Sequence, residues 1–132
     1  MALKLSRIFG EELNYSSESI NILEKMLEYY HECVERKLMD EEQTAEIACR
    51  FGAYLGETLL RNKFAECGFE WQYEEEVPVI RHKTEDWTVR PVSKVYKRLV
   101  NSEEDSVVSF YDIGIDYFIK GNILQIKMCH RR

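Results

Sequence analysis

The residues of this sequence that could carry chemistry are a carboxylate within a helix, a tryptophan and two adjacent basic residues. Glu57 directly follows the second of two glycines in the segment "GAYLGE", while Lys97 and Arg98 lie in "RPVSKVYKRL". Trp71 lies near the start of a segment with strand character. A carboxylate near an aromatic ring and a basic side chain can bind a small ligand or transfer a proton. One interpretation, an alternative to a non-catalytic protein-binding domain, is therefore a ligand-binding or catalytic site near Glu57, Trp71 and Lys97.

Two kinds of ion pair are open to Glu57. Arg61 follows four residues later, and a surface pair at this helical spacing contributes only ~0.3 to 0.5 kcal/mol. The alternative is a partly buried pair with Lys97 or Arg98 of a later helix, where loss of one partner leaves the other charge stranded at a cost of several kcal/mol. The position of Glu57 at the border of a buried helix face leads us to predict the second arrangement.

Two further residues are candidates for catalysis, and each has a simpler explanation. His82 lies in a predicted turn, where a histidine is usually solvated. Cys49 lies on the side of its helix that we expect to be buried, where a cysteine is usually a small core residue. The sequence has no phosphate-binding glycine loop, nucleophile elbow or H-E-x-x-H motif. These observations favour a protein that is not an enzyme.

The cysteine and histidine positions give little support to a metal site. No C-x-x-C or H-x-x-x-H pair occurs, and His31 and Cys33, two residues apart on a predicted helix, point in different directions. Three of the four cysteines lie in segments predicted to be helical, and nothing indicates secretion. We therefore expect reduced thiols, no metal and no cofactor.

Composition and charge limit the classes of partner. The chain is 45% hydrophobic and 32% charged, as in ordinary globular proteins, and its formal net charge is -6. A negative net charge opposes binding to nucleic acid or to anionic lipid. The apolar runs are far shorter than the ~20 residues that span a bilayer, and the N-terminal segment turns acidic too early for a signal peptide. We expect a cytoplasmic protein that binds neither nucleic acid nor membrane.

Two acidic clusters instead suggest a basic protein partner, which their carboxylates would steer into contact. One cluster is Glu74 to Glu76, and the other comprises Glu103, Glu104 and Asp105. Immunity proteins that bind cationic toxin domains are of this general kind. The simpler explanation is that both clusters are solvated loops. A third interpretation is a small-ligand module whose pocket is lined by Tyr54, Trp71 and Tyr96.

The predicted elements follow one another in an order that suits one domain, because 132 residues leave little room for a second core. Apolar spacing and capping residues predict helices over residues 16–38, 40–68 and 91–100 and strands over 71–79 and 87–89. Residues 107–119 could be helix or strand, and their spacing and length favour a helix. Residues 123–128 could form a last strand. We predict an α+β domain in which an N-terminal helical hairpin packs on a small antiparallel sheet, followed by one or two further helices.

Side-chain patterns predict how the second helix and the strands pack. Ala45, Ala48, Gly52 and Gly56 form a stripe of small residues on one helix face, which favours close approach by another element, although the glycines could instead leave room for a ligand. In the strand region, apolar and acidic residues alternate, which predicts one dry and one wet face. The residues assigned to the dry face are Trp71, Tyr73, Val77 and Val79.

Several of these motifs together resemble a family of small bacterial domains of unknown function. The similar features are "GAYLGE", the tryptophan of "FEWQY", the helix "RPVSKVYKRL" and the closing "SVVSFY", within residues 44–118. The resemblance implies an uncharacterised cytoplasmic α+β domain. It also marks Gly56, Glu57, Trp71, Pro91, Lys97 and Arg98 as positions of interest.

Overall fold

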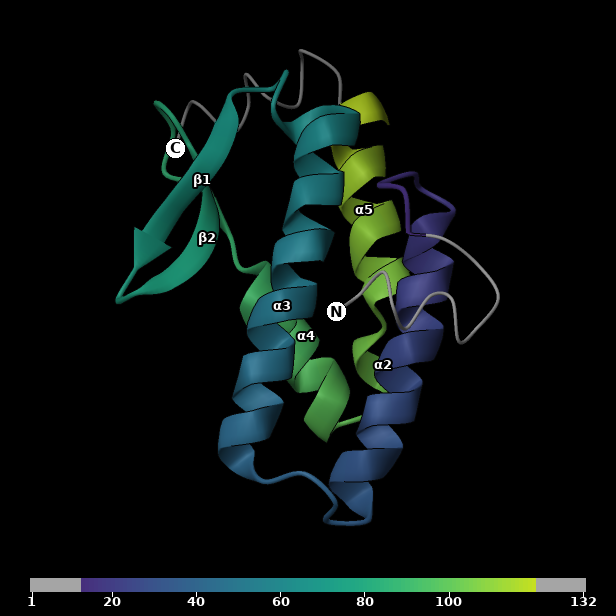
Figure 1. Cartoon of the computed structure of the whole chain (residues 1–132). Helices are drawn as coiled ribbons and strands as arrows, with labels where there is room; N and C mark the ends of the chain where they lie inside the picture. Colours follow the sequence, from purple (N-terminus) through teal and green to yellow (C-terminus); the bar gives the residue numbers. More distant parts are fainter. Residues whose placement is uncertain (1–12, 121–132) are drawn as a thin grey trace.

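The computed structural model describes residues 13–120 as four α-helices and a three-stranded antiparallel sheet (Figure 1). The prediction of an α+β fold, with two N-terminal helices, then the sheet, then further helices, is confirmed. The helices are α2 (Ser19–Glu35), α3 (Glu41–Leu59), α4 (Pro91–Val100) and α5 (Val107–Lys120). The strands are β1 (Phe69–Glu74), β2 (Val77–His82) and β3 (Thr88–Val89). None of the helices in the described part of the chain is long and apolar enough to cross a bilayer.

Helix α3 begins where its capping residue Asp40 predicts, and helical turns that follow it reach the predicted end at Gly68. The Asp40 carboxylate accepts the backbone N–H of Gln43, and the Gln43 side chain accepts the backbone N–H of Asp40, which completes a capping box. The helix continues through one π-helical turn, η1 (Leu60–Phe64), and further turns lead to Gly68. Gly68 has a φ of 98°, a left-handed conformation that glycine adopts without strain.

The core lies between the four helices and not between α2 and α3 alone. Helix α3 packs most extensively against α4, and α2 packs more against α4 and α5 than against α3. In Figure 1, α2 and α3 are joined at one end, and the two later helices lie against them. Apolar side chains without exposed surface come from all four helices and include Leu23, Leu27, Phe51, Leu55, Leu99 and Val107.

The β1–β2 register corrects the predicted assignment of side chains to the two sheet faces. Glu74 pairs with Val77, so the turn contains only Glu75 and Glu76, and Tyr73 therefore lies opposite Pro78. Paired residues share a face, so Val77 and Val79 lie on the face opposite Trp71 and Tyr73. The prediction that all four share one dry face is wrong, because the two-residue turn reverses the parity. Val79 is nevertheless buried.

The small-residue stripe on α3 allows close packing, as its pattern predicts. A Cβ atom built on Gly52 would lie 2.6 Å from the Cα atom of Val92, so the start of α4 rests on this glycine. A Cβ atom on Gly56 would collide with the ring of Trp71 on β1. The two glycines thus set the contacts of α3 with α4 and with the sheet, and the alternative in which they leave a cavity does not hold at these two positions.

The C-terminal part of the described chain is helical. Pro91 occupies the first turn of α4, where its missing N–H costs no hydrogen bond. The prediction of a helix over residues 107–119 is confirmed by α5. The predicted last strand, residues 123–128, lies outside the described residues.

Candidate functional site

The carboxylate of Glu57 binds the indole of Trp71, so these two predicted site residues are brought together. The Trp71 Nε1–H donates to Glu57 Oε1 over 3.0 Å, and Arg61 Nε donates to Oε2 over 2.8 Å. The contact requires Gly56, whose missing side chain makes room for the Trp71 ring. The hydrogen bonds from Arg61 and Trp71 lower the pKa of Glu57, although partial burial acts in the opposite direction. Glu57 is therefore an anion at neutral pH.

Beside this carboxylate lies a cleft of about 620 Å³ that we call the Glu57 cleft. Its walls are mainly aromatic or apolar and come from the chain before α2, from α3 and from the β1–β2 hairpin. The lining residues are Tyr15, Arg50, Ala53, Tyr54, Glu57, Trp71, Gln72, Tyr73 and Pro78. Its volume lies within the range of small-molecule pockets, about 300 to 1,000 Å³.

Hydrogen bonds hold two of the aromatic rings of the Glu57 cleft in place. The rings of Tyr15 and Tyr54 stack with centroids 4.7 Å apart. The Tyr54 hydroxyl accepts the backbone N–H of Tyr15 over 2.8 Å and lies 2.6 Å from the Ser19 hydroxyl. The Arg61 guanidinium lies over the Tyr15 ring, 3.9 Å from its centroid. One side of the Glu57 cleft is thus a rigid aromatic surface that already contacts a cation.

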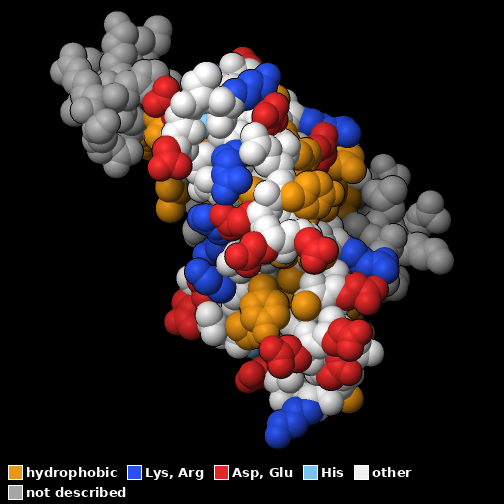
Figure 2. All heavy atoms as spheres, turned by 90° about the vertical axis from the view of Figure 1, so that its left-hand side faces the viewer, with side chains coloured by type: hydrophobic (Ala, Val, Ile, Leu, Met, Phe, Trp, Pro, Cys, Tyr) orange, Lys and Arg blue, Asp and Glu red, His pale blue; other side chains and the backbone are white. Residues whose placement is uncertain are grey.

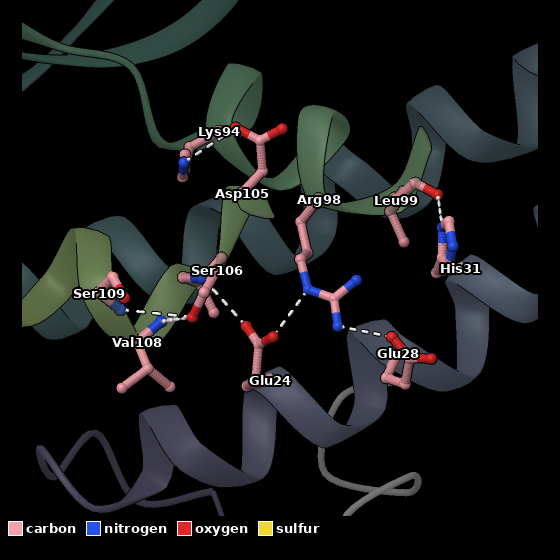
Figure 3. A network of polar contacts seen from close by, with 11 residues as sticks. Glu24, Glu28, His31, Lys94, Arg98, Leu99, Asp105, Ser106, Val108 and Ser109 are labelled. Carbon is pink, nitrogen blue, oxygen red and sulfur yellow. Dashed lines mark hydrogen bonds and ion pairs between the residues drawn. The ribbon is translucent and has the colours of Figure 1, made fainter. Parts of the chain in front are cut away.

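The predicted pair between Glu57 and Lys97 or Arg98 is wrong. Arg98 points away from Glu57 and toward α2, where its Nε bonds Glu24 and its Nη2 bonds Glu28, each over 2.7 Å (Figure 3). Arg98 is 1% exposed, and its Nη1 has no hydrogen-bond partner among the described residues. Burial acts to lower the pKa of Arg98, but hydrogen bonds to Glu28 and Glu24 outweigh it and raise the pKa, so Arg98 stays charged.

The second oxygen of Glu24 extends this network to the last described helix. Glu24 Oε1 accepts the backbone N–H of Val107, the first residue of α5, over 2.9 Å. One carboxylate therefore binds both the buried guanidinium of α4 and a free N–H at the start of α5. The role of this network is structural, since it joins α2, α4 and α5.

The acidic loop before α5 is partly neutralised within the molecule. Glu103, Glu104 and Asp105 form a short 3-10 helix. Asp105 accepts hydrogen bonds from Asn101 over 2.9 Å and from Lys94 over 3.2 Å, and these two contacts lower its pKa. Glu103 and Glu104 are exposed, so only these two carboxylates of the predicted cluster face solvent fully.

The tip of the β1–β2 hairpin exposes two carboxylates and a large aromatic ring. Glu75 and Glu76 have φ angles of 51° and 70°, as at the central positions of a type I′ turn, which glycine, asparagine and aspartate usually occupy. Tyr73 is 73% exposed, and Val77 is also exposed. Glu74 differs from its neighbours, because Arg81 and Arg90 both bind its carboxylate over 2.9 Å. We use the name hairpin tip for Tyr73, Glu75, Glu76 and Val77.

On the face turned to the viewer in Figure 2, acidic and basic side chains are intermixed, with patches of hydrophobic side chains between them. Among the described residues, several charges are paired, as in Arg50–Glu46, Lys63–Glu66 and Arg61–Glu57. Within the described part of the chain, the carboxylates of Glu75 and Glu76 have no ion-pair partner, in contrast to these pairs.

The remaining predicted candidates do not join the Glu57 cleft. Lys97 is exposed and lines a separate shallow pocket with Thr88 and Phe110, and Tyr96 packs against the core. His82 Nδ1 accepts the backbone N–H groups of Thr84 and Glu85, and its Nε2 lies 2.9 Å from the Cys67 carbonyl oxygen. Through these contacts, the His82 side chain stabilises the backbone of the turn that follows β2.

The cysteines in the described part of the chain are free thiols with different degrees of exposure. Cys49 is exposed, which corrects the prediction that it lies in the core. Cys33, Cys49 and Cys67 are free thiols. Within residues 13–120, no group of three or more His, Cys, Asp or Glu side chains is arranged to hold a metal ion.

A second hollow, of about 590 Å³, lies between the sheet, the end of α3 and α5. It is lined mainly by apolar side chains, including Phe64, Phe69, Trp87, Phe110 and Ile113. Its polar groups, Lys94 and Glu104 among them, are few. This hollow shares none of its lining residues with the Glu57 cleft.

Sequence reasoning identified Glu57 and Trp71 but missed Tyr15 and Tyr73 as neighbours of the same cleft. The position of Tyr73 follows from the length of the hairpin turn, because a two-residue turn places Tyr73 and Pro78 beside Trp71 and Ile80. The sequence has no comparable signal for Tyr15, which precedes α2 and reaches α3 only through tertiary packing.

Comparison with known proteins adds no functional assignment. No family model, no curated protein and no solved structure matches this chain. The similarity of its motifs to a bacterial domain family therefore remains a resemblance, and any function has to be argued from the geometry of the chain itself.

Proposed function

We propose that this chain is a non-catalytic protein-binding domain whose hairpin tip contacts a basic protein partner. The observation that carries the proposal is the pair of glutamates at the positive-φ positions of the turn. A non-glycine residue in such a conformation costs about 1 to 3 kcal/mol and persists where function or surrounding structure requires it. The two-residue turn imposes these angles, but packing does not explain why glutamates occupy the two positions, because both side chains are exposed.

The side chains next to the turn have the chemistry of a binding surface. Exposed aromatic residues are frequent among those that dominate binding energies, and Tyr73 is the most exposed of the large hydrophobic side chains in the described part of the chain. Glu75 and Glu76 would accelerate association with a cationic partner. Glu103 and Glu104 form a second acidic group that could act with them. An immunity-type protein of the bacterial cytoplasm, bound to a cationic toxin domain, would fit this description.

A photo-crosslinking experiment tests this proposal directly. A benzophenone amino acid replaces Tyr73 in one variant and Tyr29, which is 50% exposed on α2, in a matched control. Both variants are expressed in the cells that produce the protein and irradiated. We expect one protein with a basic surface to be captured from position 73 only, and less of it as salt rises. Equal capture from both positions, or capture that is independent of salt, would contradict the proposal.

A second candidate function is binding of a small molecule in the Glu57 cleft. The observation in its favour is the combination of a suitable volume, aromatic walls and one hydrogen-bonded carboxylate. Such a ligand would raise the melting temperature of the wild-type chain. It would have a much smaller effect on Trp71→Leu, which removes one wall of the cleft.

A further inference from the structure

The Glu57 cleft already contacts one guanidinium, that of Arg61. Two groups contact it at the same time: the Glu57 carboxylate, 2.8 Å from Nε, and the Tyr15 ring, whose centroid lies 3.9 Å from Cζ. A carboxylate together with an aromatic face is the combination that recognises an arginine side chain in protein complexes. The contacts of Arg61 thus show that a guanidinium fits the position between the Glu57 carboxylate and the Tyr15 ring.

The structure around Arg61 is more elaborate than a surface ion pair requires. A helical pair with a spacing of four residues forms without help from other elements. Here Trp71 of β1 fixes the second oxygen of the carboxylate. On the other side, Tyr54 of α3 fixes Tyr15 through a hydrogen bond and a stacked ring. Residues of two separate elements, β1 and α3, therefore orient the two groups that contact the guanidinium.

Arg61 itself is held only weakly. Its side chain is 54% exposed, and only its Nε is within hydrogen-bonding distance of Glu57. Exposed ion pairs and exposed cation–π contacts each contribute little, because water competes for both partners. Arg61 can therefore leave its position without disturbing the fold, whereas Glu57, Tyr15 and Trp71 remain in place.

We propose that the Glu57 cleft receives an arginine side chain of the basic partner, and that Arg61 occupies the guanidinium position until this arginine displaces it. The inference rests on the proposed function, since it names the residue that the partner inserts. The hairpin tip supports it, because Tyr73 belongs both to the cleft wall and to the tip. The exchange leaves the charge of the cleft unchanged, so Glu57 is not left without a cation at any stage.

Arginine fits this position better than lysine. A guanidinium is planar, stacks on aromatic rings and donates two parallel N–H groups to one carboxylate. Arg61 donates to Oε2 of Glu57 through its Nε alone, while Oε1 of Glu57 accepts from Trp71. An arginine that enters from outside can donate one hydrogen bond to Oε2 and a second to the remaining lone pair of Oε1.

The test is an NMR titration of the full chain with N-acetylarginine amide, and with N-acetyllysine amide as a comparison. The chain has two tryptophans, so the indole N–H of Trp71 reports on the cleft and that of Trp87, which lines the other hollow, is the internal reference. We expect the arginine derivative to shift the Trp71 signal only. Removing the internal competitor with Arg61→Gln should tighten binding roughly fivefold or more.

Two further variants separate recognition from general electrostatics. Lys63→Gln removes a positive charge two residues away, from a pair with Glu66 that does not contact the cleft, and it should leave affinity unchanged. In the Arg61→Gln background, Glu57→Gln should abolish binding while its amide oxygen can still accept from Trp71. Equal gains from Arg61→Gln and Lys63→Gln would overturn the inference. So would arginine binding that survives Glu57→Gln, or equal binding of the lysine derivative.

The outcome is independent of the crosslinking experiment. If the arginine derivative binds as expected and no protein is captured at position 73, the arginine site stands and the proposed protein partner does not. If a basic protein is captured at position 73 and the arginine derivative leaves the Trp71 signal unchanged, protein binding stands and the arginine site does not.

Discussion

Arg98 Nε lies 2.7 Å from Glu24 Oε2, so a guanidinium with almost no exposed surface on α4 is bound to a carboxylate on α2. The pair joins residues 74 positions apart in the sequence. Glu28 binds the same guanidinium through Nη2. Loss of a carboxylate leaves this buried cation without one of its two partners, and water cannot replace that partner because Arg98 is 1% exposed.

Arg98→Met should destabilise the protein, at most by the about 3 to 5 kcal/mol that breaking a fully buried pair from one side costs, because the two carboxylates that remain are partly exposed. Arg98→Lys should also be costly, since one ammonium cannot bind both carboxylates in the geometry of the guanidinium. Glu24→Gln should cost more than Glu28→Gln, because the Glu24 side chain is 20% exposed against 45% and also accepts the Val107 N–H. Urea unfolding measures all four values, and equal costs for the two glutamates would contradict the assigned role of Glu24.

Gly52→Ala should destabilise the protein by about 1 to 3 kcal/mol, the usual cost of overpacking. The new methyl group would meet the Val92 backbone, which cannot move without shifting α4. Gly114→Ala on α5 is the matched control, because the nearest atom to its new methyl group is Phe64 Cζ at 3.3 Å, in a side chain that can adjust. The control should be nearly neutral, since alanine also favours the helix by ~1 kcal/mol. Thermal unfolding of both variants gives the comparison.

The contribution of Glu57 to stability should depend on pH. Its pKa in the folded protein is lowered from the ordinary value of 4.5, so the unfolded chain takes up the proton first as pH falls. The stabilisation is therefore present in full well above pH 4.5 and is lost as pH falls through the lower pKa of the folded state. We expect wild type to be more stable than Glu57→Gln at pH 7, and the difference in unfolding free energy to shrink below pH 4.5. If the difference in unfolding free energy between wild type and Glu57→Gln stays constant down to pH 3, the charge of the Glu57 carboxylate does not contribute to stability.

Replacing the turn residues should raise stability at the expense of binding. Glu75→Asn with Glu76→Gly supplies the residues that a type I′ turn favours, and relief of strain should stabilise the protein by at least about 1 kcal/mol. Glu75→Gln with Glu76→Gln is the control that removes the charges and keeps the strain. It should leave the denaturation midpoint nearly unchanged. Both double variants should lose crosslinking from position 73. If Glu75→Asn with Glu76→Gly does not raise the unfolding free energy, the argument from backbone strain is refuted.

The sequence predicted the fold well because its local signals agree with the tertiary structure. The capping box at Asp40, the left-handed glycine at Gly68 and the proline at the start of α4 each act within a few residues. Apolar spacing separates helix from strand over the whole described range. The face assignment of Val77 and Val79 failed, since the parity of a strand after a turn depends on the length of the turn and alternation alone does not reveal it.

The candidate site was predicted in part for the same reason. Glu57 and Trp71 meet because Gly56, a visible sequence feature, leaves room for the ring. The partners of Arg98 were not predictable from local patterns, because Glu24 and Glu28 lie 74 and 70 residues away and look like ordinary solvated glutamates of an amphipathic helix. Long-range polar contacts of this kind depend on how α2 crosses α4, which hydrophobic spacing does not specify.

The bond between Glu24 and the Val107 N–H, which spans 83 residues, also constrains the order of events during synthesis. While the ribosome produces α2 and α3, neither oxygen of Glu24 has its final partner, and the carboxylate stays in water. Contacts that close such long loops form late and slow the search for the native state. In any nascent chain that ends before α5, the amide hydrogens of α2 should therefore exchange freely with solvent. They should become protected only when α5 docks against α2.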